Sequence, residues 1–168
     1  ISVMMNDGTG LFLPRDIETP LGAGGFSILA RDVDGDLDLD IISGTGSSQR
    51  VVIMTNDGNA NFEFKYEMRI DGGRVAQVEA GDLDGDGDVD VIAEQQGRNA
   101  ISLAFNDSTG VMGGRVENGV GTTPQAAVAA DFDGDGDLDL LLPGALLMGD
   151  TPPSADSQLG APERLLLN

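Results

Sequence analysis

DVDGDLDLD at residues 32–40, DLDGDGDVD at residues 82–90 and DFDGDGDLD at residues 131–139 are the three segments of this sequence that decide its fold. They hold 15 of the 22 aspartates, and their first residues lie 50 and 49 positions apart. A second marker, an Asn-Asp turn sequence, occurs once before each acidic segment, with spacings of 50 and 50. Two independent markers with one period indicate an internal repeat, and periods of 20 to 50 residues are typical of solenoids, propellers and arrays.

Short apolar runs fill the rest of each repeat and predict β-strands. Apolar runs such as LDIIS (39–43) follow each acidic segment, and runs such as RVVIMTN (50–56) end at the Asn-Asp sequence. A run of small and β-branched residues, such as FSILAR (26–31), precedes each acidic segment, and a last run, such as FEFKYEMRI (62–70), follows the turn. The period therefore holds about four strands. Asn, Asp and Gly between apolar runs favour hairpin turns, and no stretch has a convincing helical periodicity. The turn markers begin at Asn6, Asn56 and Asn106.

We therefore expect an all-β fold built from propeller-type blades of four antiparallel strands. The strands after the acidic segments become apolar on both faces, so each sheet should lie between two neighbours. About three repeats are too few to close a ring, since propellers typically have four to eight blades. We expect a partial propeller, or one completed by another chain.

We expect the whole chain, residues 1–168, to form a single domain made of repeats. The expected units are a partial blade (1–20), two blades (21–70 and 71–120) and an irregular last blade (121–168).

Two strand assignments are open in the last blade. Either residues 150–162 are an inserted loop and residues 164–168 the third strand, or residues 145–150 are the third strand and residues 164–168 the fourth.

The charge of the chain excludes several classes of partner. Nine basic residues against 29 acidic ones give a formal charge of −20, which disfavours nucleic acids and anionic membrane surfaces. The absence of Cys and His excludes disulfides, thiolate sites and the commonest general base. No apolar run approaches the ~20 residues of a membrane helix, so we expect no membrane insertion.

Each acidic segment has the donor pattern of a loop around a hard cation. Five carboxylates at odd positions repel one another unless a cation neutralises them, and the loop must curl for them to converge. Glycines at positions 4 and 6 allow that curl, but Leu37 replaces the glycine in the first segment. By analogy with other calcium loops, we expect side-chain ligands at positions 1, 3, 5 and 9 and a backbone carbonyl at position 7. The carboxylate at position 7 should then point to solvent or to a neighbouring group.

Other calcium motifs do not fit. An EF-hand needs an acid at position 12, where Ser43, Ala93 and Leu142 stand, and it needs a following helix. The sequence lacks the cysteines of thrombospondin type 3 repeats and the GGxGxD nonapeptides of RTX arrays.

DxDGDGDxD before an apolar strand, followed by a strand that ends in NDGxGxF, resembles the FG-GAP/VCBS repeat family of calcium-binding β-propellers. Integrin α-chain head domains and many secreted bacterial proteins are similar in this respect. The resemblance covers roughly residues 1–142. It implies one Ca²⁺ in the first hairpin of each blade, about three ions in all, on a scaffold used for adhesion, ligand binding or as an accessory module. The implied ligands are Asp32, Asp34, Asp36, Asp38, Asp40, Asp82, Asp84, Asp86, Asp88, Asp90, Asp131, Asp133, Asp135, Asp137 and Asp139.

We expect a non-catalytic, extracellular, secreted or cell-surface scaffold for adhesion, recognition or self-assembly. Exposed single-loop sites belong to a weak calcium class, with Kd on the order of 10⁻⁴ M, and would be empty in a resting cytosol. Cut blades leave unpaired strand edges, so we expect a protein partner or self-association through the terminal strands, as a homo-oligomer, a fibre or part of a longer chain.

The alternatives are a carbohydrate-binding propeller lectin and an accessory module of a secreted polysaccharide-degrading enzyme. A glycan is therefore a further candidate partner, although the chain offers only one Tyr, Tyr66, and no Trp as a sugar platform. An enzyme is not expected, because nearly all candidate carboxylates are assigned to metal.

Four residues outside the acidic segments also carry expectations. We expect Glu79 and Glu94 to be surface charges, and Phe12 and Phe62 to belong to the core. Asn106-Asp107-Ser108 matches a glycosylation sequon, but we expect it to form a tight turn.

Overall fold

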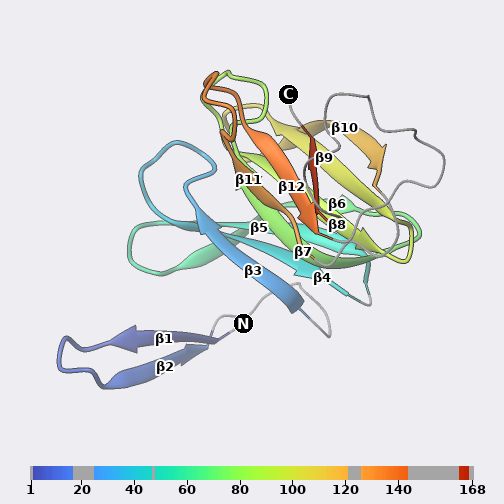
Figure 1. Cartoon of the computed structure of the whole chain (residues 1–168). Helices are drawn as coiled ribbons and strands as arrows, with labels where there is room; N and C mark the ends of the chain where they lie inside the picture. The colour runs from blue at the N-terminus through green and yellow to red at the C-terminus, as the bar shows by residue number, and fades with distance from the viewer. Residues whose placement is uncertain (1, 17–24, 47, 121–125, 144–162, 167–168) are drawn as a thin grey trace, which may run out of the picture.

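The computed structural model describes residues 2–16, 25–46, 48–120, 126–143 and 163–166 (Figure 1). These residues form thirteen β-strands and no helix, so the all-β prediction is confirmed. Within the same residues, nothing has the length and hydropathy of a membrane-spanning helix.

The strands form a hairpin and three open antiparallel sheets. The N-terminal hairpin consists of β1 (Ser2–Asn6) and β2 (Phe12–Asp16). The first sheet consists of β3 (Gly25–Arg31), β4 (Asp40–Thr45), β5 (Arg50–Asn56) and β6 (Phe62–Arg69). The second consists of β7 (Arg74–Gly81), β8 (Asp90–Gln96), β9 (Ala100–Asn106) and β10 (Met112–Gly119). The third consists of β11 (Val128–Ala130), β12 (Asp139–Pro143) and β13 (Glu163–Leu166). Four-stranded antiparallel sheets in sequential order confirm the blade prediction, and the sheets formed by the described residues do not close into a ring.

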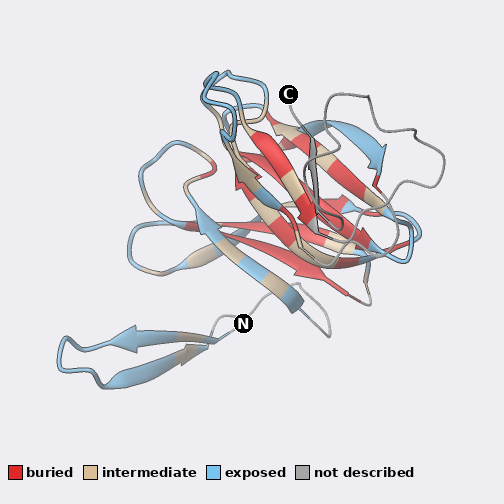
Figure 2. Cartoon of the chain, viewed as in Figure 1, coloured by how far each residue is buried: buried red, intermediate tan, exposed pale blue. Residues whose placement is uncertain are grey.

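Alternation along the central strands gives the first and second sheets two apolar faces each. In the first sheet, Ile42 pairs with Ile53, and both belong to one core cluster. Their neighbours Ile41 and Met54, also paired, belong to a separate cluster on the opposite face. Every residue of β4 is buried, as are all residues of β8 except the last (Figure 2). Among the described residues, the second sheet packs against a neighbour on each face, as the sequence predicted, whereas the first sheet packs against the second sheet on one face.

The first and second sheets meet face to face. β7 contacts β3, β4 and β5 of the first sheet, and it contacts β11 of the third. The largest core cluster fills the interface between the first two sheets: Val33, Ile42, Val51, Ile53, Met68, Ile70, Val75, Val78, Ala80, Val91, Ala93, Ala104 and Met112. A smaller cluster joins the second sheet to the third: Ile92, Ile101, Val120, Ala127, Leu140 and Leu142.

The N-terminal hairpin extends to one side of the stacked sheets (Figure 1). Its Arg15 donates to the carbonyl oxygen of Asn59 at 2.8 Å, and so joins the hairpin to the first sheet. Phe12 is 52% exposed, so the expectation that it belongs to the core was wrong, because β1 and β2 form a sheet of only two strands. Phe62, at the same place in a complete sheet, packs against Ile41, Val52 and Met54 as expected.

The C-terminal strand settles the order of strands in the last blade. β13 pairs with β12 on the side opposite β11, which is the place that β9 takes beside β8. Glu163–Leu166 is therefore a third strand, in agreement with the first of the two assignments. Residues 145–150, the alternative third strand, lie outside the described residues.

One position of the repeat distinguishes the two interfaces between sheets. Gly44 lies four residues after the last aspartate of its acidic segment, and a Cβ added there would lie 2.6 Å from Cγ1 of Val75. The glycine therefore lets β7 pack closely on β4. The same position in the second sheet is Glu94, which shares a face with Ile92 and thus points toward the third sheet.

Glu94 is only 1% exposed, so the expectation that it is a surface charge was wrong. Neither of its carboxylate oxygens has a hydrogen-bond partner among the described residues, and burial raises the pKa of Glu94 from 4.5 to about 7. Glu79 is half-buried, and its carboxylate lies 3.9 Å from the Arg31 guanidinium. When a strand is buried on both faces, an acidic residue within it is buried too. The apolar run VDVIAE (89–94) could therefore have predicted the burial of Glu94.

Replacing Gly44 with Ala should weaken the interface between the first and second sheets. The added methyl group would lie 2.6 Å from Val75 Cγ1 and 3.1 Å from Val78 Cγ1, so we expect a loss of about 1–3 kcal/mol in the free energy of unfolding. Urea denaturation measures it. Gly119→Ala is the matched control, because an added Cβ there meets nothing within 4 Å. Equal stability of the two variants would contradict the close packing at Gly44.

Replacing Glu94 with Gln should remove a pH-dependent loss of stability. Because the folded-state pKa of about 7 exceeds the ordinary 4.5, the wild type should lose stability as the pH rises between these values and keep that loss above about pH 8. We expect Glu94→Gln to be more stable than the wild type at pH 8.5, on the order of 2–3 kcal/mol, and nearly equal at pH 4. Chemical denaturation at both pH values measures the difference, with exposed Glu63→Gln as the control. A gain at pH 4 as large as that at pH 8.5 would refute the assignment.

Candidate metal centre

The three acidic segments form loops of the same shape, which we call loop 1 (32–40), loop 2 (82–90) and loop 3 (131–139). Each loop joins the first and second strands of its sheet. In loop 1, Asp32 accepts one hydrogen bond from the N–H of Gly35 at 2.8 Å and another from the N–H of Leu37 at 2.9 Å. The first aspartates of loops 2 and 3 accept the same pair of bonds from positions 4 and 6. Each loop therefore curls around its first aspartate.

The curl requires left-handed backbone at positions 4 and 6. Gly35 at position 4 of loop 1 has φ of 77°, and Gly87 and Gly136 at position 6 have φ of 94° and 102°. Leu37 takes the same conformation, with φ of 75°, and its side chain is 89% exposed. The departure at Leu37 therefore leaves the shape of loop 1 intact but places a side chain in a conformation that costs about 1–2 kcal/mol.

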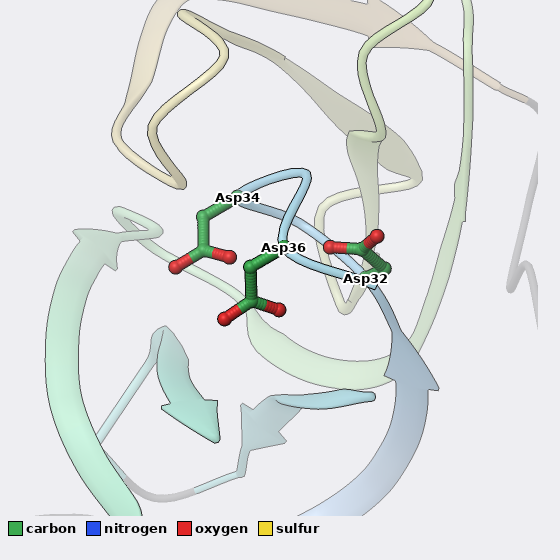
Figure 3. Close-up of side chains that lie close together, drawn as sticks. All are labelled: Asp32, Asp34 and Asp36. Carbon is green, nitrogen blue, oxygen red and sulfur yellow. The ribbon is translucent and has the colours of Figure 1, made fainter. Parts of the chain in front are cut away.

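The curl brings carboxylates together. Asp32, Asp34 and Asp36 each offer an oxygen atom within 4.8 Å of the others, and Figure 3 shows the three side chains projecting from one turn of loop 1. Loop 2 groups its positions 1, 3 and 5 in the same way, whereas loop 3 groups positions 1, 3 and 9, which are Asp131, Asp133 and Asp139.

The donor set fits a hard divalent cation. It consists only of carboxylate oxygens, which are the ligands that Ca²⁺ prefers. One of them, Oδ1 of Asp34, is buried and has no hydrogen-bond partner among the described residues. A buried carboxylate oxygen without a donor is costly unless a cation or a water binds it. The residues present therefore fit a calcium ion.

The last aspartate of each loop has a structural role that sequence reasoning missed. Asp40 is fully buried, and it accepts from the N–H of Val33 at the start of loop 1 and from the N–H of Asn56 at the end of β5, both at 2.8 Å. Asp90 accepts the equivalent bonds from Leu83 and Asn106. Burial raises the pKa of Asp40 and of Asp90, although the two N–H donors act in the opposite direction. In loops 1 and 2 this aspartate therefore joins the loop to the third strand.

In loops 1 and 2, the carboxylate at position 7 points to the Asn-Asp turn of its own sheet. A Cβ added at Gly58 would lie 2.6 Å from Oδ2 of Asp38, and the hydroxyl of Ser108 donates to Oδ2 of Asp88. At position 5, Oδ1 accepts from the N–H of position 7 in all three loops. The neighbouring group expected for position 7 is thus the turn after the third strand.

The second position of loops 1 and 2 anchors each loop in the next interface between sheets. Val33 is 2% exposed and belongs to the core cluster between the first two sheets. Leu83 packs against the cluster between the second and third sheets, and Phe132, in the last sheet, is 45% exposed. An apolar residue between the first two aspartates of every loop was the sequence signal for this packing role.

The assignment of the fifteen aspartates as metal ligands stays a prediction.

Replacing Leu37 with Gly should stabilise the chain, because glycine adopts positive φ without a steric cost. After the larger entropy of the unfolded glycine is subtracted, we expect a gain of about 0.5–1 kcal/mol in the free energy of unfolding, measured by urea denaturation. Leu39→Gly, also at an exposed leucine of loop 1 but without positive φ, should instead destabilise. Destabilisation by both variants would show that Leu37 is unstrained.

Comparison with known families identifies the middle of the chain. Residues 32–93 match the model of the FG-GAP-like repeat, and this segment runs from loop 1 to the strand after loop 2. No curated protein matches the sequence. The all-β sheets, the period of the acidic loops and this match agree with the resemblance seen in the sequence, and the chain contains an FG-GAP-like repeat over residues 32–93.

Proposed function

We propose that this chain is a non-catalytic repeat scaffold whose three acidic loops each bind one Ca²⁺. The observation that carries the proposal is the grouping of three carboxylate oxygens within 4.8 Å of one another in each loop. The FG-GAP-like match over loops 1 and 2 supports the same assignment. Positions 1, 3 and 5 would hold the ion in loops 1 and 2, and positions 1, 3 and 9 in loop 3.

The calcium ion supplies positive charge where the folded loop concentrates negative charge. The chain's own residues prepare that place: N–H groups orient the first aspartate, and the core holds the second residue of loop 1. Because the loop is ordered only in the folded chain, binding stabilises the folded state by mass action. With Kd on the order of 10⁻⁴ M, millimolar Ca²⁺ contributes roughly 1–2 kcal/mol per site.

Weak sites of this kind support an extracellular, secreted or cell-surface location, where calcium is millimolar. We propose adhesion, recognition or self-assembly as the role of the scaffold, with a protein strand as partner. Within the described strands β1 pairs with β2 alone, and the hairpin exposes Met4, Phe12 and Leu13 by 51–53%. An apolar hairpin with an unpaired edge favours strand addition.

The sugar-binding alternative has less support. Tyr66, the single tyrosine, is half-buried and packs against the core cluster between the first two sheets. It therefore offers little of the exposed ring face on which a sugar would stack.

Calcium should raise the melting temperature by about 10 °C between 1 mM EDTA and 2 mM CaCl₂, from three sites of roughly 1–2 kcal/mol each. Asp82→Asn combined with Asp84→Asn should lose about a third of that shift, because it removes two of the three grouped carboxylates of loop 2. Asp71→Asn, at an exposed aspartate outside the loops, is the control for charge and should keep the full shift. An equal melting temperature with and without calcium would refute the proposed function.

A further inference from the structure

The side chain of Asn106, the last residue of β9, lies between loop 1 and loop 2. Its Nδ2 donates to the carbonyl oxygen of Val33 in loop 1 at 2.7 Å and to that of Val89 in loop 2 at 3.2 Å. Its Oδ1 accepts from the N–H of Gly110 at 3.0 Å, and the residue is 8% exposed. The amide is therefore fully bonded and buried, which leaves no free Nδ2 for a glycan.

Each of the two carbonyl groups lies next to an aspartate of its loop: Val33 adjoins the grouped carboxylates of loop 1, and Val89 adjoins the buried Asp90. Val33 stands between Asp32 and Asp34, and Val89 precedes Asp90. The backbone N–H of Asn106 also donates to Oδ1 of Asp90 at 2.8 Å. One residue thus holds the backbone of loop 1 and both the backbone and a carboxylate of loop 2.

The turn after Asn106 packs on loop 1 as well. A Cβ added at Gly110 would lie 3.6 Å from Cγ2 of Val33 and 3.8 Å from Cβ of Asp34. The contact between the second sheet and loop 1 therefore involves the turn as well as the amide group, and it adjoins Asp34, one of the three grouped aspartates.

Asn56, at the same position one repeat earlier, makes only some of the hydrogen bonds that Asn106 makes. Its N–H donates to Asp40 at 2.8 Å and its Nδ2 to the carbonyl of Leu39 at 3.2 Å, which are the bonds within its own sheet. Among the described residues, Nδ2 of Asn56 donates to its own loop alone, and Oδ1 of Asn56 is buried without a partner. Asn56 is therefore an internal control that keeps the bonds within one sheet and lacks the bond between loops.

We propose that Asn106 is a positioning residue that couples calcium binding at loop 2 to calcium binding at loop 1. The inference rests on the proposed function, because it assumes an ion in each loop. An ion in loop 2 fixes Val89 and Asp90, and through them the side chain of Asn106. A fixed Asn106 holds the peptide between Asp32 and Asp34, so loop 1 loses less conformational entropy when it binds its own ion. The coupling is reciprocal, since an ion in loop 1 must favour loop 2 by the same factor.

The test is a calcium titration of the full chain followed by NMR, with the amide signals of Gly35, Gly85 and Gly134 as reporters for loops 1, 2 and 3. These amides donate to the first aspartate of each loop, so each reports its own site. Loop 2 is disabled with Asp82→Asn and Asp84→Asn. With Asn106 present, we expect this to raise the Kd at loop 1 by about 5- to 20-fold.

In Asn106→Ala, disabling loop 2 should leave the Kd at loop 1 unchanged within twofold. Asn56→Ala should keep the 5- to 20-fold effect, because it lacks the bond between loops. Asn106→Asp, which keeps an acceptor for Gly110 but loses the Nδ2 donor, replaces the alanine variant if that variant does not fold. Coupling that persists in the Asn106 variant used, or a loop 1 that ignores loop 2 in the wild type, would overturn the inference. If none of the three reporters responds to millimolar calcium, the proposed function itself has failed.

Discussion

A buried aspartate that accepts two backbone N–H groups is the interaction on which the first two sheets depend. Asp40 joins the start of loop 1 to the end of the third strand, and Asp90 does the same in the next sheet. A carboxylate that is removed from water without donors would cost several kcal/mol, so these bonds are obligatory once the strand is buried. They fix where the loop begins and ends, and the remaining carboxylates can then converge only on the inside of its curve.

The stack of sheets explains why equivalent residues differ in exposure. The second position of the loop is buried at Val33, half-buried at Leu83 and 45% exposed at Phe132. Val33 packs in the interface between the first two sheets, and Leu83 packs in the interface between the second and third sheets. Gly44 and Glu94 occupy the same position of the repeat but have different surroundings. Two valines pack against Gly44 in one interface, whereas the other interface encloses the carboxyl group of Glu94. The repeat therefore prescribes a common local shape, whereas the neighbouring sheet decides the energetics of each copy.

The rigid sheets and the charged loops have complementary parts in the proposed scaffold. The interfaces between sheets contribute the apolar burial that orders the strands, and the loops add a term that depends on cation concentration. Asn106 links the two, because it lies at a sheet end and contacts two loops. If each loop holds a cation as proposed, binding would order the loops that Asn106 joins.

The sequence alone determined the strands, the period, the antiparallel sheets and the positions of the acidic loops. These follow from local rules: alternation of apolar residues, turn-forming Asn, Asp and Gly, and repulsion among clustered carboxylates. Only the tertiary structure decided that Glu94 is buried, that Phe12 is exposed, and that Asn106 reaches Val33 across 73 residues. It also decided that the last aspartate of a loop binds backbone N–H groups. The physical reason is that burial and long-range hydrogen bonds depend on which sheet covers a residue, and a repeat of 50 residues gives every copy nearly the same local pattern whatever its neighbours.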